Sequence, residues 1–344
     1  MIVIKRVYTL ALLLLALTGC FRYSDVSRSA VNLYDWEARL TNVCTPSDSS
    51  CVLFFNKVDT ASIWRVQTGT REKQKTKHLT GWKFSPSIHG DAWVRLGSVQ
   101  MGVLRNHEGF DERIFLYDLE MDSFSIVPVT VEGISQWWLE ENALHFICRH
   151  DGKKEATVDS RGYYSEVPCP NYGVAKSISW SHSLGRCWIQ YDIDSLFVGI
   201  PGTATRFPVA APISLAPLHD GTMLIVSAPA SDQVDLYTFN GQDITQVHSL
   251  SAQGSHYCTP LVYGQNVFVP VIRSASLLGV VYDGLFSIDS GRHWHFLALG
   301  TMRDIFSLTD QSLYFVGDAA TIRMIDLNRV ASKEKHSKRT GRKP

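Results

Sequence analysis

The chain has 344 residues, of which 45% are hydrophobic and 19% are charged. These values exclude a disordered polymer, a collagen-like fibre and a polytopic membrane protein. The 33 basic and 33 acidic residues cancel, but residues 1–19 carry +2 and residues 329–344 carry +6, which leaves about −8 on residues 20–328. Because nucleic acids bind to basic surfaces, we expect no nucleic acid among the partners.

The N-terminus predicts an export signal. Two basic residues precede the apolar stretch Val7–Leu17, which is too short to span a bilayer, since that takes roughly 20 residues. The stretch runs into Leu17-Thr-Gly-Cys20, which resembles the lipobox of bacterial lipoproteins. The resemblance implies removal of residues 1–19 and lipidation of Cys20. Inner-membrane lipoproteins have a retention signal with aspartate directly after the cysteine, and Phe21 stands there instead. The resemblance therefore also implies an outer-membrane lipoprotein that faces the periplasm. An ordinary signal peptide with an incidental cysteine is the alternative.

Six cysteines remain beside Cys20, and an oxidising compartment favours disulfides among them. They are Cys44, Cys51, Cys148, Cys169, Cys187 and Cys258. Cys44 and Cys51 flank a turn-rich segment and form the candidate disulfide, while Cys148–Cys169 and Cys187–Cys258 are further pairings to consider. A metal site at Cys148 and His150, or at His256 and Cys258, is the alternative, but no Cys-x-x-Cys spacing supports it. We therefore predict no metal and no cofactor.

From about residue 31 the chain is a succession of short runs, rich in β-branched and aromatic residues and separated by turn residues. Examples are 51–55, 61–66, 92–96, 113–117, 143–147, 187–191 and 266–271. Their length and period-two alternation predict strands, and no segment has the apolar stripe of a helix over three turns. The sequence therefore predicts an all-β body.

These strands recur in groups. The groups open near Ile134, Ala175, Ile213, Tyr257 and Ile305, at intervals of 41, 38, 44 and 48 residues. A period of this length with four strands per unit is typical of β-propeller blades. Two earlier units, at 31–79 and 80–130, bring the number of blades to seven, with six as the main alternative and a β-sandwich pair as another architecture.

The last unit has only three clear strands, so we expect a strand from the N-terminal segment, near Asn32–Leu40, to complete it and close the ring. The expected organisation is a signal peptide at 1–19, a tether at 20–30, a propeller at 31–328 and a basic disordered tail at 329–344. Such a tail suits either an anionic membrane surface or a purely solubilising role.

One motif supports this fold. Ser287-Ile-Asp289-Ser-Gly291-Arg-His-Trp294 matches Ser-x-Asp-x-Gly-x-x-Trp and resembles the Asp-box of sialidase-like propellers. The resemblance implies a structural turn between the third and fourth strands of a blade, in which the aspartate accepts backbone hydrogen bonds and the glycine takes a positive φ. We therefore interpret Asp289 as structural rather than catalytic.

The patterns of enzyme chemistry are mostly missing. The arginine-containing signature tetrapeptide of sialidases does not occur, nor do nucleophile-elbow, zinc-protease or phosphate-loop motifs. The acidic groups Asp118/Glu120/Asp122, Glu140/Glu141 and Asp192/Asp194 are weak candidates for a glycosidase pair, and the first of them suits a solvated turn. His293 and His295 alternate and would share one side of a strand, but no third metal ligand accompanies them. We therefore predict a protein that is not an enzyme.

Trp137 and Trp138 are the candidate interface residues, because adjacent residues of a strand point to opposite faces and one of them is expected near the surface. The lipobox and the all-β body with its Asp-box resemble the immunity lipoproteins of type VI secretion systems. That resemblance implies a protein partner, a secreted phospholipase effector, which the propeller face would block. The alternatives are a glycan-binding or glycoside-hydrolysing propeller and an envelope assembly scaffold.

Overall fold

A computed structural model describes most of the body of the chain. The described residues are 27–32, 39–47, 49–67, 72–85, 93–106, 108, 111–131, 134–148, 154–168, 175–192, 195–200, 203–206, 212–230, 232–251, 256–257, 259–276, 279–317 and 321–332. The predicted signal peptide, the lipidation site Cys20 and residues 333–344 lie outside this set.

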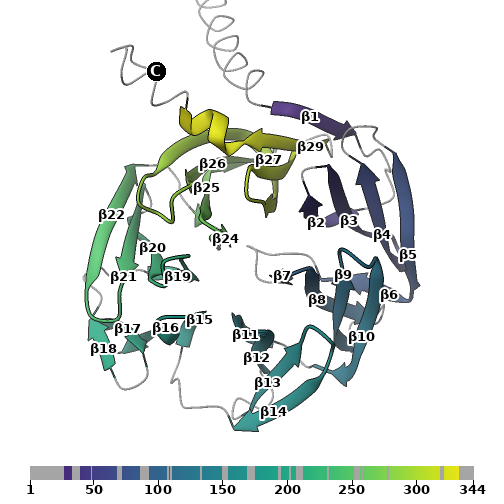
Figure 1. The fold of residues 1–344 in the computed structure, drawn as a ribbon, viewed down its shortest axis with the longest axis horizontal. Coiled ribbons are helices and arrows are strands. Elements are labelled where there is room, and N and C mark those ends of the chain that lie inside the picture. The colour runs from purple at the N-terminus through teal and green to yellow at the C-terminus, as the bar shows by residue number, and fades with distance from the viewer. Residues whose placement is uncertain are drawn as a thin grey trace, which may run out of the picture.

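The strands form seven antiparallel blades around a centre, and the first three blades come from residues 39–168 (Figure 1). Blade 1 contains β2 (Arg39–Ser47), β3 (Ser50–Asn56), β4 (Thr60–Gln67) and β5 (Lys73–Thr80). Blade 2 contains β6 (Trp82–Phe84) and β7 (Trp93–Leu96), which both pair with β8 (Val99–Asn106), then β9 (Glu112–Asp118) and β10 (Ser123–Thr130). Blade 3 contains β11 (Ile134–Glu140), β12 (Ala143–Cys148), β13 (Lys154–Asp159) and β14 (Tyr164–Pro168).

The remaining blades follow in chain order. Blade 4 contains β15 (Ala175–Ser181), β16 (Gly185–Asp192), β17 (Ser195–Ile200) and β18 (Thr203–Arg206). Blade 5 contains β19 (Pro212–Pro217), β20 (Met223–Ala230), β21 (Gln233–Phe239) and β22 (Ile244–Ser251). Blade 6 contains β23 (His256–Tyr257), β24 (Leu261–Tyr263), β25 (Asn266–Ser276), β26 (Gly279–Ser287) and the first half of β27 (His295–Leu308). The predicted all-β propeller is therefore confirmed, with seven blades rather than six.

Blade 7 closes the ring. It contains the second half of β27, then β28 (Ser312–Gly317), β29 (Thr321–Asp326) and, as its outermost strand, β1 (Ser27–Asn32), which pairs antiparallel with β29. An N-terminal strand does complete the last blade, but the predicted range Asn32–Leu40 was wrong. Leu40 instead belongs to β2, where it is buried between blades 1 and 7. The closing strand starts at Ser27, inside the segment that the sequence assigned to a tether.

Seven hydrophobic clusters hold the described part of the propeller together, and each fills the contact between two neighbouring blades. Between blades 1 and 2, for example, Phe54 packs edge-on against Phe84, with ring centroids 5.3 Å apart. The cluster between blades 3 and 4 is the smallest, since Trp138 and Ile178 are its fully buried members. Burial of apolar side chains is the main favourable term in folding, so another interaction is expected to support this contact.

The described part of the chain ends in one helical turn. Residues 327–332 are helical, the Asp326 side chain caps this turn by accepting a hydrogen bond from the Arg329 backbone N–H at 3.0 Å, and Ala331 is buried against blades 6 and 7. The boundary expected at residue 328 therefore falls inside an ordered element. Within the described ranges, no helix has the length and apolar character needed to cross a bilayer.

The antiparallel order within a blade places the turns between strands 1 and 2 on the same face as those between strands 3 and 4. We call this face the turn face. Its described inner turns, beside the centre of the ring, are residues 49, 97–98, 141–142, 182–184, 218–222, 264–265 and 309–311, in blades 1 to 7 respectively. Its outer turns include residues 119–122, 160–163, 240–243 and 288–294.

Candidate functional site

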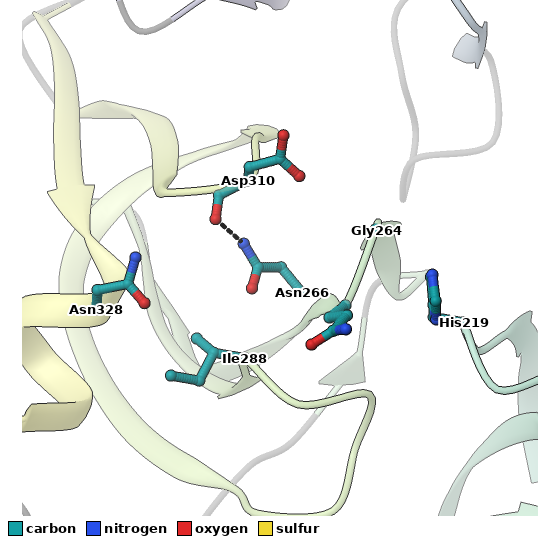
Figure 2. A pocket seen from close by; sticks show the side chains of 7 residues that line it. His219, Gly264, Asn266, Ile288, Asp310 and Asn328 are labelled. Carbon is teal, nitrogen blue, oxygen red and sulfur yellow. Dashed lines mark hydrogen bonds between the residues drawn. The ribbon is translucent and has the colours of Figure 1, made fainter.

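A polar pocket of about 390 Å³ opens on the turn face where blades 5, 6 and 7 meet (Figure 2). Its lining residues are His219, Gly264, Gln265, Asn266, Ile288, Asp310 and Asn328. His219 comes from the inner turn of blade 5, Asp310 from that of blade 7, and Asn328 from the helical turn after β29. The pocket therefore depends on the packing of three successive blades.

Asn266, the first residue of β25, fixes the wall between blades 6 and 7. Its side chain is only 5% exposed, and its Nδ2 donates hydrogen bonds to the backbone oxygens of Thr309, at 2.8 Å, and Asp310, at 2.7 Å. Both donor hydrogens of the amide are used in this way. Among the described residues none donates to Asn266 Oδ1, so this oxygen remains a hydrogen-bond acceptor at the pocket.

Asp310 lies close to the backbone of the neighbouring turn. A Cβ atom at Gly264 would lie 3.1 Å from Asp310 Oδ1, and the φ of Gly264 is +56°. Glycine suits this position because it adopts positive φ without strain and leaves room for the carboxylate. The turn of Asp310 is itself held by Thr309, whose Oγ1 accepts a hydrogen bond from the Ser312 backbone N–H at 3.0 Å. The carboxylate is thus carried by a well-fixed turn.

Acidic residues predominate in the described turns of the turn face. The acids are Glu72, Glu120, Asp122, Glu141, Asp220, Asp243, Asp289 and Asp310, and the basic residues are Arg161, Arg292 and, in the helical turn that carries Asn328, Arg329. Charges of one sign on one face attract an oppositely charged partner and raise its association rate. The turn face is therefore suited to a basic partner.

A second polar arrangement lies between blades 3 and 4, which we call the interblade charge cluster: Glu140, His145, Glu155, Arg186 and Trp138. Arg186 of β16 forms a two-point ion pair with Glu155 of β13, with N–O distances of 2.8 and 2.9 Å. It also binds Glu140, and its guanidinium lies 5.5 Å from the centroid of the Trp138 ring. Each member is thus held by at least one other.

The buried carboxylate of Glu155 is the centre of this cluster. Its side chain has no exposed area, whereas those of His145 and Arg186 are 13% and 21% exposed. Burial raises the pKa of Glu155, but the hydrogen bond with His145 and the charge and hydrogen bonds of Arg186 outweigh it, so the pKa is lowered overall. Glu155 is therefore held as a carboxylate that is fully engaged, which is typical of a structural ion pair.

The turn at residues 287–294 adopts the hydrogen-bonding pattern expected of it. Asp289 Oδ1 accepts hydrogen bonds from Ser287 Oγ, at 2.8 Å, and from the His293 backbone N–H, at 2.9 Å. Gly291 has a φ of +80°, and Trp294 packs against the cluster between blades 5 and 6. The turn joins β26 to β27, the third and fourth strands of blade 6. Its geometry accounts for these residues by local structure.

The predicted disulfide between Cys44 and Cys51 was wrong. Both thiols are free and buried, as is that of Cys187, which also excludes the pairing Cys187–Cys258. In the register of β2 and β3, Cys44 pairs with Val52, so its neighbour Cys51 points to the opposite face of blade 1. Burial raises the pKa of all three thiols to about 12. Cys169 and Cys258 lie outside the described residues.

The two candidate interface residues point to opposite faces of blade 3, as predicted, but neither is exposed. Trp138 is 4% exposed and its Nε1 donates to Glu140 Oε2 at 3.1 Å, while Trp137 is half-buried against the cluster between blades 2 and 3. Trp138 is therefore not a surface anchor, and Trp137 is the member of the pair that lies nearer the surface. The polar neighbours of Trp138 keep it inside the contact between blades 3 and 4.

The other candidate residues from the sequence, the acidic turn at Asp118 and the two histidines, do not lie together in one site. Asp118 Oδ1 accepts from the backbone N–H groups of Glu120 and Met121, as expected for a solvated turn. His293 is exposed and bonds to Asp289, whereas His295 is buried and stacks on Phe286. The expected alternation of the two histidines was wrong because His293 belongs to the turn. No group of three or more metal-ligating side chains occurs within the described residues.

Neither the pocket nor the interblade charge cluster was predicted from the sequence. His219, Asn266 and Asp310 lie 44 to 91 residues apart, so that no local pattern links them. The predicted runs also stop short of both partners, since Glu155 lies in β13 and Arg186 is the second residue of β16. A charge at a buried strand position requires a partner.

Comparison with protein-family models and with curated proteins finds no match. Among solved structures the chain is similar to a streptogramin B lyase, with 12% identity and a TM-score of 0.52 over 87% of this chain and 96% of that one. A chain of a mitotic checkpoint complex gives 10% identity and a TM-score of 0.54 over 88% and 94% of the two chains. The propeller of a trilobed protease from Pyrococcus furiosus, described as having an open velcro topology, gives 12% and 0.52 over 87% and 92%. At this identity the likeness shows the fold alone, a seven-bladed β-propeller.

Proposed function

We propose that this chain is a non-enzymatic lipoprotein that faces the periplasm and binds a partner protein through the turn face of its propeller. The observation that carries the proposal is the polar pocket among blades 5, 6 and 7, set in a face whose described turns are mostly acidic. A rigid ring with a hollow, charged face supplies both shape and electrostatic complementarity to a basic partner. Lipidation at Cys20, implied by the lipobox, would keep the propeller near the membrane.

The finer proposal is that the partner is a phospholipase effector of a type VI secretion system, which the propeller blocks as an immunity protein. It is supported by the resemblance of residues 17–20 to a lipobox, joined to a propeller body. Inhibition would then follow from occlusion of the effector's active site by the turn face, without a reaction centre on this chain.

The test combines the mature chain with a phospholipase encoded beside its gene. We expect a complex of nanomolar affinity and loss of lipase activity, both weakened by Asp220→Lys on the turn face and unaffected by Thr245→Lys on the exposed outer strand β22. Equal effects of the two variants would refute binding through the turn face. Hydrolysis of a sialoside by the purified chain would refute the non-enzymatic part of the proposal.

The anchor has its own test. We expect the wild-type chain to incorporate a labelled fatty acid and to fractionate with the outer membrane, whereas Cys20→Ser does neither. An unlabelled wild-type chain would refute the anchor and leave binding through the turn face open to the previous test.

A further inference from the structure

We infer that the pocket among blades 5, 6 and 7 receives a cationic side chain, arginine or lysine, from the partner protein. This inference rests on the proposed function and gives it a specific contact. The pocket residues that matter are Asn266, Asp310 and Ile288, together with the glycine at position 264.

The one carboxylate that lines the pocket is that of Asp310, while His219, Gln265 and Asn328 add side chains that can both donate and accept hydrogen bonds. The Asn266 amide donates both of its hydrogens to the backbone oxygens of Thr309 and Asp310, so that only its oxygen can bind a ligand. The Asp310 carboxylate accepts no hydrogen bond from a described residue, and no lysine or arginine lines the pocket. An acceptor pair that includes a carboxylate favours a ligand that carries positive charge and several donors.

The turn that carries Asp310 is fixed before any ligand binds, and the Asp310 side chain is exposed at the edge of the pocket. The backbone oxygen of Asp310 is held by Asn266, and its carboxylate lies against Gly264 of the neighbouring blade. Because the turn is held in place, only the side-chain torsions of Asp310 lose freedom when a ligand binds. Figure 2 shows Asp310, Asn266 and Asn328 around one hollow.

The size and the apolar wall suit a side chain rather than a free ion. A volume of about 390 Å³ is near the lower end of the range of roughly 300–1,000 Å³ for small-ligand pockets. Ile288, half-buried at its edge, offers a surface for the methylene groups of a lysine or arginine stem. The pocket thus combines a contact for the charged head with a contact for its stem.

The experiment titrates the mature chain with N-acetylarginine methylamide and follows binding by NMR, with the citrulline analogue as the uncharged control. We expect millimolar binding of the arginine probe, none of the citrulline probe, and a loss of about tenfold or more in Asp310→Asn. Asp243→Asn, the same change of charge at another turn of the same face, is the matched control and should bind as the wild type does. Equal binding of the two probes, or equal binding by the two variants, would overturn the inference.

The two proposals fail in different ways. If the arginine probe binds through Asp310 but no effector binds, the proposed function is refuted and the preference of the pocket for a cation stands. If the effector binds Asp310→Asn and Asp243→Asn equally tightly, the inference is refuted and binding through the turn face stands.

Discussion

Arg186 of blade 4 donates hydrogen bonds from both terminal guanidinium nitrogens to the two carboxylate oxygens of Glu155 in blade 3, with N–O distances of 2.8 and 2.9 Å. Glu155 has no exposed area, so that this ion pair lies inside the contact between the two blades. The same contact has the smallest apolar cluster of the described propeller. An ion pair with its hydrogen bonds satisfied therefore replaces part of the apolar packing that the other contacts use.

Replacing Arg186 by leucine should destabilise the propeller strongly. The substitution leaves the carboxylate of Glu155 buried without its main partner, which costs about 3–5 kcal/mol for fully buried pairs and somewhat less here because the Arg186 side chain is 21% exposed. Urea unfolding measures the change in the free energy of unfolding.

Arg105→Leu is the matched control, because its ion pair with Glu112 involves an arginine side chain that is 51% exposed. Such pairs contribute about 0–1 kcal/mol. The double variant Arg186→Leu/Glu155→Gln should recover part of the loss, since it removes the uncompensated charge. A loss in Arg186→Leu no larger than in Arg105→Leu would contradict a stabilising role for the cluster.

The cluster should also make stability depend on pH in a predictable direction. The pKa of Glu155 is lowered in the folded state, so its contribution is fully present above the ordinary glutamate pKa of about 4.3 and is lost as the pH falls through the lower folded value. The free energy of unfolding of the wild type should therefore exceed that of Glu155→Gln at pH 6, and the difference should shrink below about pH 4. A difference that is constant from pH 6 to pH 3 would contradict this assignment.

The sequence predicts the blades well because each is a local unit. Strands such as β3 and β9 form from short consecutive runs of apolar residues, and the predicted openings at Ile134 and Ala175 coincide with the first residues of β11 and β15. The closing strand was misplaced because the pairing of β1 with β29 joins the two ends of the chain. Alternation alone cannot tell which N-terminal run reaches that edge.

The sites were harder to predict because their residues are far apart in the chain, as are the two strands that close the ring. The pocket joins Asn266 of one blade to Asp310 of the next through a hydrogen bond to a backbone oxygen, a contact with no trace in residue type. The disulfide prediction failed on register, because a two-residue period decides which face a cysteine occupies. Turn chemistry is local, and the interactions of Asp289 were predicted correctly for that reason.

The thiols should be unreactive in the folded chain. Because burial raises the pKa of Cys44, Cys51 and Cys187 to about 12, the reactive thiolate is nearly absent at pH 8. We expect peptide mapping after treatment with iodoacetamide to find these three cysteines unmodified in the native chain and alkylated after unfolding in guanidinium. Recovery of a Cys44–Cys51 linked peptide under non-reducing conditions would contradict the arrangement of β2 and β3.

Asp289→Ala should lower stability without affecting binding at the pocket. The substitution removes the acceptor of the Ser287 hydroxyl and of the His293 backbone N–H, a loss of about 1–2 kcal/mol in total for a half-exposed turn. Asp243→Ala is the control, since it removes a turn acid of the same face for which no side-chain hydrogen bond is found among the described residues. Thermal unfolding compares the two variants, and equal melting temperatures would contradict a structural role for Asp289.

The closure of the ring yields the last prediction. Val31 pairs with Ile322 and Asn32 with Thr321, so removal of residues 20–32 from the mature chain leaves the outer edge of β29 unpaired. An open strand edge offers unsatisfied backbone groups to a second chain. We therefore expect a lower urea midpoint and a concentration-dependent dimer in size-exclusion chromatography. Removal of residues 20–26 alone, which spares β1, should leave both properties as in the wild type. If the shorter chain without β1 stays monomeric and equally stable, β1 does not close the propeller, and another segment must cover β29.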